Sequence, residues 1–214
     1  MLAALLVSLK VVGVATLVIA VFGTLLALLL ARGRFPGRTL LELLLTLPLV
    51  LPPTVVGFFL LYLLGRGSPL REWLGLDLLF TWQGAAVAAS LVGLPLMLQS
   101  ARAAIAAVDP ELEDAARTLG RSEPEVLLRV TLPLAHRGIL AGLFLGTARA
   151  LGEFGATLMV AGNIPGRTRT LPMVVYDAAL SGDLATAAQV SLLLSGIAFL
   201  ALAITRRLEQ PSRR

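Results

Sequence analysis

Residues 109–136 read DPELEDAARTLGRSEPEVLLRVTLPLAH, a polar stretch between two long apolar segments. We call this stretch the polar island. It combines carboxylates and arginines with apolar residues at helical spacing. Asp109 can cap a helix, Pro110 suits its first position, and Gly120 suits its C-terminal end. The island therefore predicts a short amphipathic helix up to Gly120, followed by a second short helix that Pro133 ends.

The segments on both sides of the island are long enough to cross a bilayer. Hydrophobic residues make up 57% of the 214 residues and charged residues 14%, with a mean hydropathy of +0.87. Soluble domains have about a quarter of their residues charged. A spanning helix needs about 20 apolar residues. Five segments meet this length: 2–31, 40–64, 82–108, 138–161 and 185–205. They predict an all-α integral membrane protein, a bundle of about five transmembrane helices that forms one domain over 1–214.

Basic residues are unevenly distributed around these segments. Most arginines follow the first segment, surround the island or follow the last segment: Arg32, Arg34, Arg38, Arg102, Arg117, Arg121, Arg129, Arg137, Arg206, Arg207, Arg213 and Arg214. The other connections carry Arg66, Arg71, Arg167 and Arg169, with Lys10 near the N-terminus. Because cytoplasmic loops are enriched in basic residues, we predict the N-terminus outside and the island and C-terminus in the cytoplasm. The net charge of +5 then reflects membrane topology, and we expect no nucleic-acid partner.

Prolines interrupt the second apolar segment. Pro48, Pro52 and Pro53 remove backbone donors, so they are expected to kink or break this helix. Inside a membrane such a break persists only where protein or water satisfies the freed carbonyls, which favours a segment that faces the bundle interior. A helix that simply starts after Pro48 is the other interpretation.

The sequence predicts no cofactor bound by this chain. There is no cysteine, and the single histidine, His136, has no metal-ligating neighbours in the sequence. No glycine-rich loop of the Walker type is present for a nucleotide. We therefore expect neither a metal nor a catalytic site.

The acidic residues of the island separate two interpretations of its first helix. A helix that rests on lipid headgroups usually has a basic polar face. This helix instead carries Glu111, Glu113 and Asp114, which an anionic leaflet would repel. Its alanines allow close approach of another protein. The charge therefore favours docking against a partner.

The spacing within the island resembles the cytoplasmic coupling motif of ABC-importer permeases. That motif reads E-A-A, three residues, G, nine residues, I, any residue, L-P. The chain has Asp114-Ala115-Ala116, Gly120, Val130 and Leu132-Pro133 at these spacings, with aspartate in place of glutamate and valine in place of isoleucine. By this resemblance, the residues that couple to an ATPase are Glu113, Asp114, Ala115, Ala116, Gly120, Leu132 and Pro133.

Further stretches resemble the molybdate-transporter permease subunit in particular. They are SLK at 8–10, LPLVLPPTVVGFFLL at 47–61, LEDAARTLG at 112–120 and TARALGEFGATLMVAGNIPGRTRTLP at 147–172. The resemblance implies a type I ABC importer permease fold in the cell inner membrane and a tetrahedral oxyanion as substrate, molybdate or tungstate. Sulfate permeases share related forms of the segment around Glu153, so a sulfate or thiosulfate importer is the alternative.

The resemblance also implies partners. These are a second copy of the chain in a homodimer with one central path, two cytoplasmic ATPase subunits that bind ATP and magnesium, and an extracytoplasmic oxyanion-binding protein. Membrane lipid surrounds the assembly.

Two charged residues lie near the middle of the fourth apolar segment. Arg149 and Glu153 are four residues apart and so share one helix face. Charges at this depth are costly unless paired or hydrated. They predict either a translocation path, in which Arg149 helps an oxyanion to pass, or a neutral pair that locks helices together.

The residues around this pair complete the set of path or gate candidates. Gly152 and Gly155 allow close helix approach or a hinge. Asn163, Arg167 and Arg169 lie in the outer connection, where the arginines either receive an anion or are ordinary solvated loop residues.

Two other classes of function remain open at this point. One is a membrane enzyme that uses Arg149, Glu153 and His136, although these groups are far apart along the membrane normal. The other is a structural subunit without a path.

Overall fold

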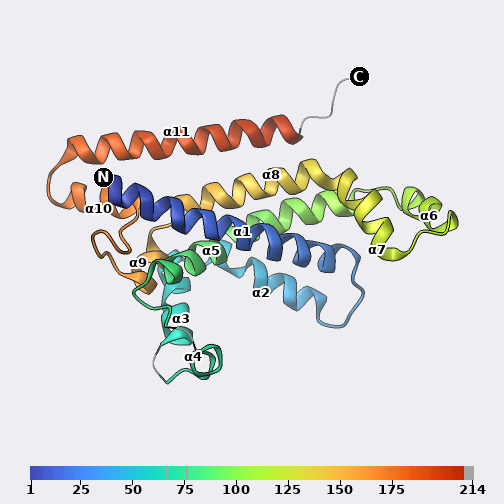
Figure 1. The fold of residues 1–214 in the computed structure, drawn as a ribbon, viewed down its shortest axis with the longest axis horizontal. Coiled ribbons are helices and arrows are strands. Elements are labelled where there is room, and N and C mark those ends of the chain that lie inside the picture. Colours follow the sequence, from blue (N-terminus) through green and yellow to red (C-terminus); the bar gives the residue numbers. More distant parts are fainter. Residues whose placement is uncertain (66, 76, 210–214) are drawn as a thin grey trace.

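Long helices run side by side along one direction (Figure 1). The computed structural model describes residues 1–65, 67–75 and 77–209, so Arg66, Arg213 and Arg214 lie outside the described residues. The described part contains helices and no strands. Its elements are α1 (Leu2–Arg32), α2 (Arg38–Val50), α3 (Pro53–Leu64), α4 (Pro69–Leu74), α5 (Trp82–Ala106), α6 (Pro110–Thr118), α7 (Glu123–Val126), η1 (Leu127–Thr131), α8 (Leu132–Leu151), α9 (Gly155–Ala161), α10 (Leu171–Leu180) and α11 (Leu184–Glu209).

The described helices agree with the predicted fold class. Four of them are long and apolar enough to cross a membrane, and the bent pair α2 and α3 makes a fifth if it counts as one span. The all-helical architecture with about five crossings is therefore confirmed.

Helix α5 forms the centre of the bundle. In its most apolar 18-residue window 67% of the residues are buried, against 28% in α1 and 17% in α11. The buried positions of α5 are mostly small, which lets α1 and α8 pack closely against it. The outer helices instead present leucines and phenylalanines outward, as expected for a surface that lipid covers.

The contact between α5 and α8 depends on two glycines. A Cβ atom on Gly93 would lie 2.5 Å from the carbonyl oxygen of Gly146, and one on Gly146 would lie 2.9 Å from that of Gly93. Ile19 of α1 also contacts this point. Helices α1, α5 and α8 therefore meet at these two glycines.

The second predicted span is broken into two helices, and the break does not lie at Pro48. Helix α2 begins at Arg38 and continues through Pro48 to Val50. The break lies at Leu51 and Pro52, and α3 leaves at an angle of 118°. The interpretation of a helix that starts after Pro48 is wrong, because the adjacent prolines that follow it form the stronger breaker.

The fourth predicted span differs from expectation at both ends. The island's second helix does not stop at Pro133. Instead α7 continues through a π-turn, in which the amide of Leu132 bonds to the carbonyl of Leu127, directly into α8. Pro133 therefore lies inside a continuous helix, in the first turn of α8 directly after the π-turn. At the other end, residues 152–154 separate α8 from α9, a break that the sequence analysis did not predict.

The two ends of the bundle carry different features. Helices α6 and α7 lie at one end, and the N-terminus, α9 and α10 lie at the other (Figure 1). Helix α11 runs back from α10 toward the island end. We call these the island end and the N-terminal end.

We predict that Gly93→Ala destabilises the protein by about 1–3 kcal/mol, because the added methyl group overlaps a backbone oxygen of α8. Thermal unfolding of the purified chain in detergent measures the effect. Gly13→Ala in α1 is the matched control, since no atom lies within 4 Å of its Cβ position. Equal melting temperatures for the two variants would contradict the close α5–α8 contact.

Candidate functional site

Helix α6 begins and ends with the predicted caps. Asp109 Oδ1 accepts a hydrogen bond from the Glu111 amide at 2.9 Å, and Pro110 occupies the first turn. After Thr118 the chain turns at Gly120, whose φ is +82°. The amide of Gly120 bonds to the Arg117 carbonyl at 2.9 Å, and the next amide bonds to the Ala116 carbonyl at 3.2 Å. These bonds satisfy carbonyls that a helix end leaves free, and the left-handed turn favours glycine.

The second helix of the island is held at its start by Ser122 and Glu125. The Glu125 carboxylate accepts from the Ser122 amide at 3.1 Å, which completes a capping box. This bond, and then Arg121 at 3.0 Å, hold the pKa of Glu125 below its usual range. Because α7 is continuous with α8, the island's second helix is the first part of a long apolar helix.

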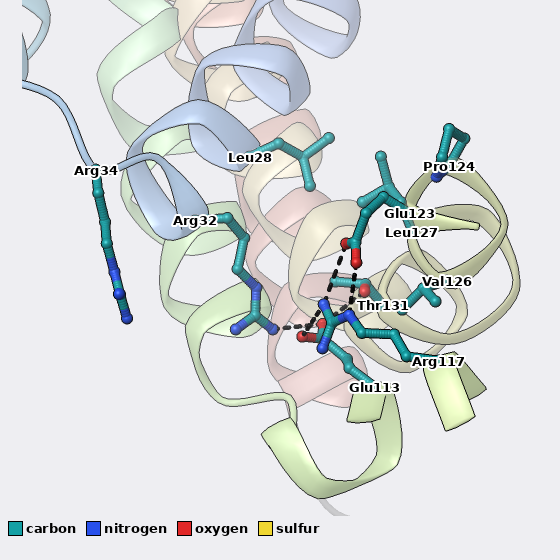
Figure 2. Close-up of a pocket in the computed structure, with 10 residues that line it drawn as sticks. All are labelled: Leu28, Arg32, Arg34, Glu113, Arg117, Glu123, Pro124, Val126, Leu127 and Thr131. Carbon is teal, nitrogen blue, oxygen red and sulfur yellow. Dashed lines mark hydrogen bonds and ion pairs between the residues drawn. The ribbon is translucent and has the colours of Figure 1, made fainter. Parts of the chain in front are cut away.

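Glu113 anchors the island to the bundle. Its side chain is buried, and Oε1 accepts from Arg32 at 2.7 Å and from the Thr131 hydroxyl at 2.6 Å (Figure 2). Arg32 also donates to the Ile105 carbonyl at 3.2 Å. One carboxylate thus connects the end of α1, the end of α5, helix α6 and the π-turn. A buried carboxylate without such partners would be strongly unfavourable, so these groups fix the position of α6.

Arg117 braces the outer side of the island. It donates to Asp114 at 2.6 Å and to Glu123 at 2.6 Å, which joins α6 to α7. These hydrogen bonds raise the pKa of Arg117, and the bond from Arg117 lowers the pKa of Glu123. The contribution of Glu123 is therefore present at neutral pH and is lost as the pH falls through its lowered pKa. All three groups are exposed, so solvent weakens this brace.

A hollow of about 590 Å³ lies between the anchor and the brace. Figure 2 shows the Glu113 carboxylate between Arg32 and Arg117, Glu123 against Arg117, and Arg34 on the loop that follows α1. The hollow is lined by residues of α1, α6, α7 and the π-turn, so it lies where these elements meet.

The predicted coupling residues divide into inward and outward groups. Glu113 points inward, whereas the side chain of Asp114 is 71% exposed. Among the remaining predicted residues, Ala115, Gly120 and Pro133 are exposed. Ala116 and Leu132 are half-buried. Their role in coupling stays a prediction.

Three further residues of the island region were missed by sequence reasoning. Leu119 is 83% exposed at the tip of α6, an apolar side chain that water covers poorly. Arg32 and Thr131 hold Glu113 from distant positions in the sequence. The motif spacing could have suggested Leu119, but no local pattern connects Arg32 with Glu113.

The second group of predicted site residues lies where α8 breaks. Arg149 Nη1 is 2.8 Å from Glu153 Oε2, and the other Glu153 oxygen accepts from the Ala156 amide at 2.8 Å. The Glu153 side chain is 1% exposed and that of Arg149 31%. Glu153 therefore caps the start of α9 and holds Arg149, whose guanidinium remains partly accessible.

The two broken spans meet at this point. A Cβ atom on Gly155 would lie 3.1 Å from Pro53, and one on Gly57 would lie 2.8 Å from Ala156. The start of α9 thus packs against the start of α3. Gly152 ends α8 with an ordinary negative φ of −82°, so its conformation does not require glycine.

The outer-connection candidates separate in space. Arg169 donates to Asn163 at 2.9 Å, Asn163 donates to Asp177 at 2.8 Å, and Arg169 lies 2.9 Å from the second Asp177 oxygen. This closed set fixes the loop before α10. Arg167 lies outside the set and forms no ion pair in the described part of the chain.

Comparison with known proteins identifies the family. Residues 20–214 match the family described as the binding-protein-dependent transport system inner membrane component. The chain belongs to this family. It is 44% identical over 215 residues to the molybdenum transport system permease protein ModB of Escherichia coli K12. The aligned region covers 98% of this chain and 94% of that protein. The same-named protein of Haemophilus influenzae is 46% identical over 71% of this chain and 68% of its own length.

More distant similarities agree with the fold. A sulfate transport system permease protein, CysW of Synechococcus elongatus, is 37% identical over 88% of this chain and 67% of its own length. A bacterial ABC transporter that imports alginate has a chain with a TM-score of 0.74 at 20% identity, covering 98% of this chain and 80% of that one. The predicted permease fold and family are therefore confirmed.

We predict that Glu113→Ala loosens the island and destabilises its attachment by about 1–3 kcal/mol, because Arg32 and Thr131 lose their shared acceptor. Limited trypsin digestion of the folded protein, followed at the exposed Arg121, measures the loosening as faster cleavage. Glu111→Ala is the matched control, an exposed carboxylate on the same helix. If both variants are cut at the wild-type rate, Glu113 is not the anchor.

Proposed function

We propose that this chain is the membrane-spanning permease subunit of an ATP-driven importer for a tetrahedral oxyanion, with molybdate as its substrate. The observation that carries the proposal is the 44% identity with a molybdenum permease along almost the whole chain. The sulfate relative is less similar, at 37%. Tungstate has the same shape and charge as molybdate and is expected to share the path.

The proposed orientation places the island end in the cytoplasm and the N-terminal end outside. The basic residues at the ends of α1 and α11 and on the island support this orientation. Two cytoplasmic ATPase subunits would then reach α6, and an extracytoplasmic binding protein would deliver the oxyanion at the opposite end. A second copy of the chain completes a central path.

The exposed side of α6 is the proposed contact with the ATPase. Leu119 supplies an apolar tip, and Asp114 and Ala115 lie on the accessible surface of the same helix. On the inner side, Glu113 ties α6 to α1 and α5. Motion of α6 would therefore be passed to the bundle through the Glu113 anchor and through the continuous α7–α8 helix.

Alternating access requires that the island binds the two states of the ATPase with different affinity. Equal affinity would shift no equilibrium, however tight the binding. Because Glu113 ties α6 to α1 and α7 continues into α8, a shift of the island would move these bundle helices with it.

We place the translocation path beside Arg149. Its guanidinium is partly accessible, and Glu153 both orients it and offsets part of its charge. The nearby contact of α3 with α9 resembles the arrangement in which broken helices surround a transported ion. A weakly held cation suits an anion that must bind and then leave.

Reconstitution of the chain with its ATPases and binding protein tests this function. We expect ATP hydrolysis and uptake to rise with molybdate or tungstate and not with sulfate. Arg149→Ala is expected to lower uptake at least tenfold in an intact complex, and Arg149→Lys to retain more uptake. Stimulation by sulfate alone would identify a sulfate importer, and no anion-dependent uptake would reject the transport function.

We predict that Gly120→Leu uncouples ATP hydrolysis from uptake. A side chain here adds bulk to the proposed docking surface and costs about 1–2 kcal/mol, because φ is +82°. Gly182→Leu is the matched control: its φ is +79°, it also has open space around its Cβ position, and it lies at the N-terminal end. Normal coupling in Gly120→Leu, or equal loss in both variants, would count against docking at α6.

A further inference from the structure

A second hollow, of about 350 Å³, lies at the N-terminal end of the bundle. Helix α1, the start of α5 and the loop before α10 enclose it. Its lining includes Lys10, Trp82, Gln83 and Arg167. Tryptophan is enriched at the level of the membrane interface, which favours a position of the hollow near the lipid headgroups.

The hollow is basic. Lys10 and Arg167 line it, and no acidic side chain does. Neither cation forms an ion pair among residues 1–65, 67–75 and 77–209, whereas the neighbouring Arg169 is held by Asp177. The first amides of α5, at Trp82 and Gln83, have no partner within their own helix. Two positive charges thus line one space, beside the start of α5, that no acidic side chain lines.

An apolar groove lies along the same two helices, deeper in the bundle. It has a volume of about 230 Å³ and is lined by α1, α3 and α5, including Val18, Phe22, Val87 and Leu91. Val18 follows Lys10 by eight residues, about 12 Å along the helix axis. Phe22 is 54% exposed and Val87 37%, so the groove is open to the side.

The hollow and the groove are separate, but α1 and α5 line both, and we call the strip of these two helices that runs from one to the other the seam. On α1 the row Lys10, Val14, Val18 and Phe22 repeats every four residues. On α5 Gln83, Val87 and Leu91 repeat in the same way. Each row begins with a polar residue at the hollow and continues with apolar residues beside the groove. A ligand that fits this seam is anionic at one end and apolar at the other.

We propose that this seam binds one anionic phospholipid. Its phosphate lies between Lys10 and Arg167, near the first amides of α5, and one acyl chain follows the groove past Val18. A free oxyanion would satisfy the cations but would leave the groove unused. The lipid would join α1 to the outer loop, next to the existing hydrogen bond from the Leu171 amide to Ser8 at 2.8 Å.

Lipid retention by the assembled transporter tests the proposal. The complex is purified from membranes, exchanged into mixed phosphatidylglycerol and phosphatidylcholine, and examined by native mass spectrometry. We expect bound phosphatidylglycerol on the wild type. Lys10→Gln and Arg167→Gln should each lower retention about fivefold, and the double variant more. Val18→Trp should lower it as well by filling the groove.

Arg71→Gln is the charge-matched control, because Arg71 lies at another position and is paired with Asp77. It should retain the lipid as the wild type does. Equal retention in all variants would overturn the proposal. Displacement of the lipid by molybdate alone would also overturn it. So would a result in which Lys10→Gln, but not Val18→Trp, loses molybdate-stimulated ATP hydrolysis in pure phosphatidylcholine. Both results would indicate a site for a free oxyanion. Size-exclusion chromatography of each complex confirms assembly before lipid is measured.

Discussion

The buried carboxylate of Glu113 holds the polar island in place. It accepts hydrogen bonds from Arg32 and Thr131, and Arg32 also reaches the end of α5. An unpaired carboxylate at this position would be too unfavourable to remain buried, so the ends of α1, α5 and α6 and the π-turn must stay together. In the proposed transport function, motion of the island must reach the bundle, and this contact joins the two.

Small residues play the corresponding part inside the membrane region. Lipid offers apolar groups as good as those of leucine, so helices associate there through close packing. Gly93 and Gly146 allow α5 and α8 to touch backbone to backbone, and Gly57 and Gly155 allow the two broken spans to meet. The central helix α5 is therefore held by close backbone contacts at glycines. The breaks in the two spans place Arg149 near the junction of α3 and α9.

Two sets of charged groups in the described part of the chain differ in their surroundings. Glu113 and Glu123 are paired with arginines of other elements, and Glu153 is paired with Arg149 and caps α9. Lys10 and Arg167 face a hollow without a counterion among the described residues. The paired groups explain how the fold is assembled, and the other two indicate where an external anionic group fits.

The sequence by itself determined the class, the approximate spans, the caps of α6 and the family, because hydropathy, cap residues and motif spacing are local properties. It could not separate Glu113 from Asp114, since neighbouring residues on a helix point in different directions and only packing decides which is buried. It also missed the break at residues 152–154 and the continuous helix through Pro133. Those features depend on contacts between segments far apart in the chain, such as Gly155 against Pro53 and Arg32 against Glu113, which only the tertiary structure decides.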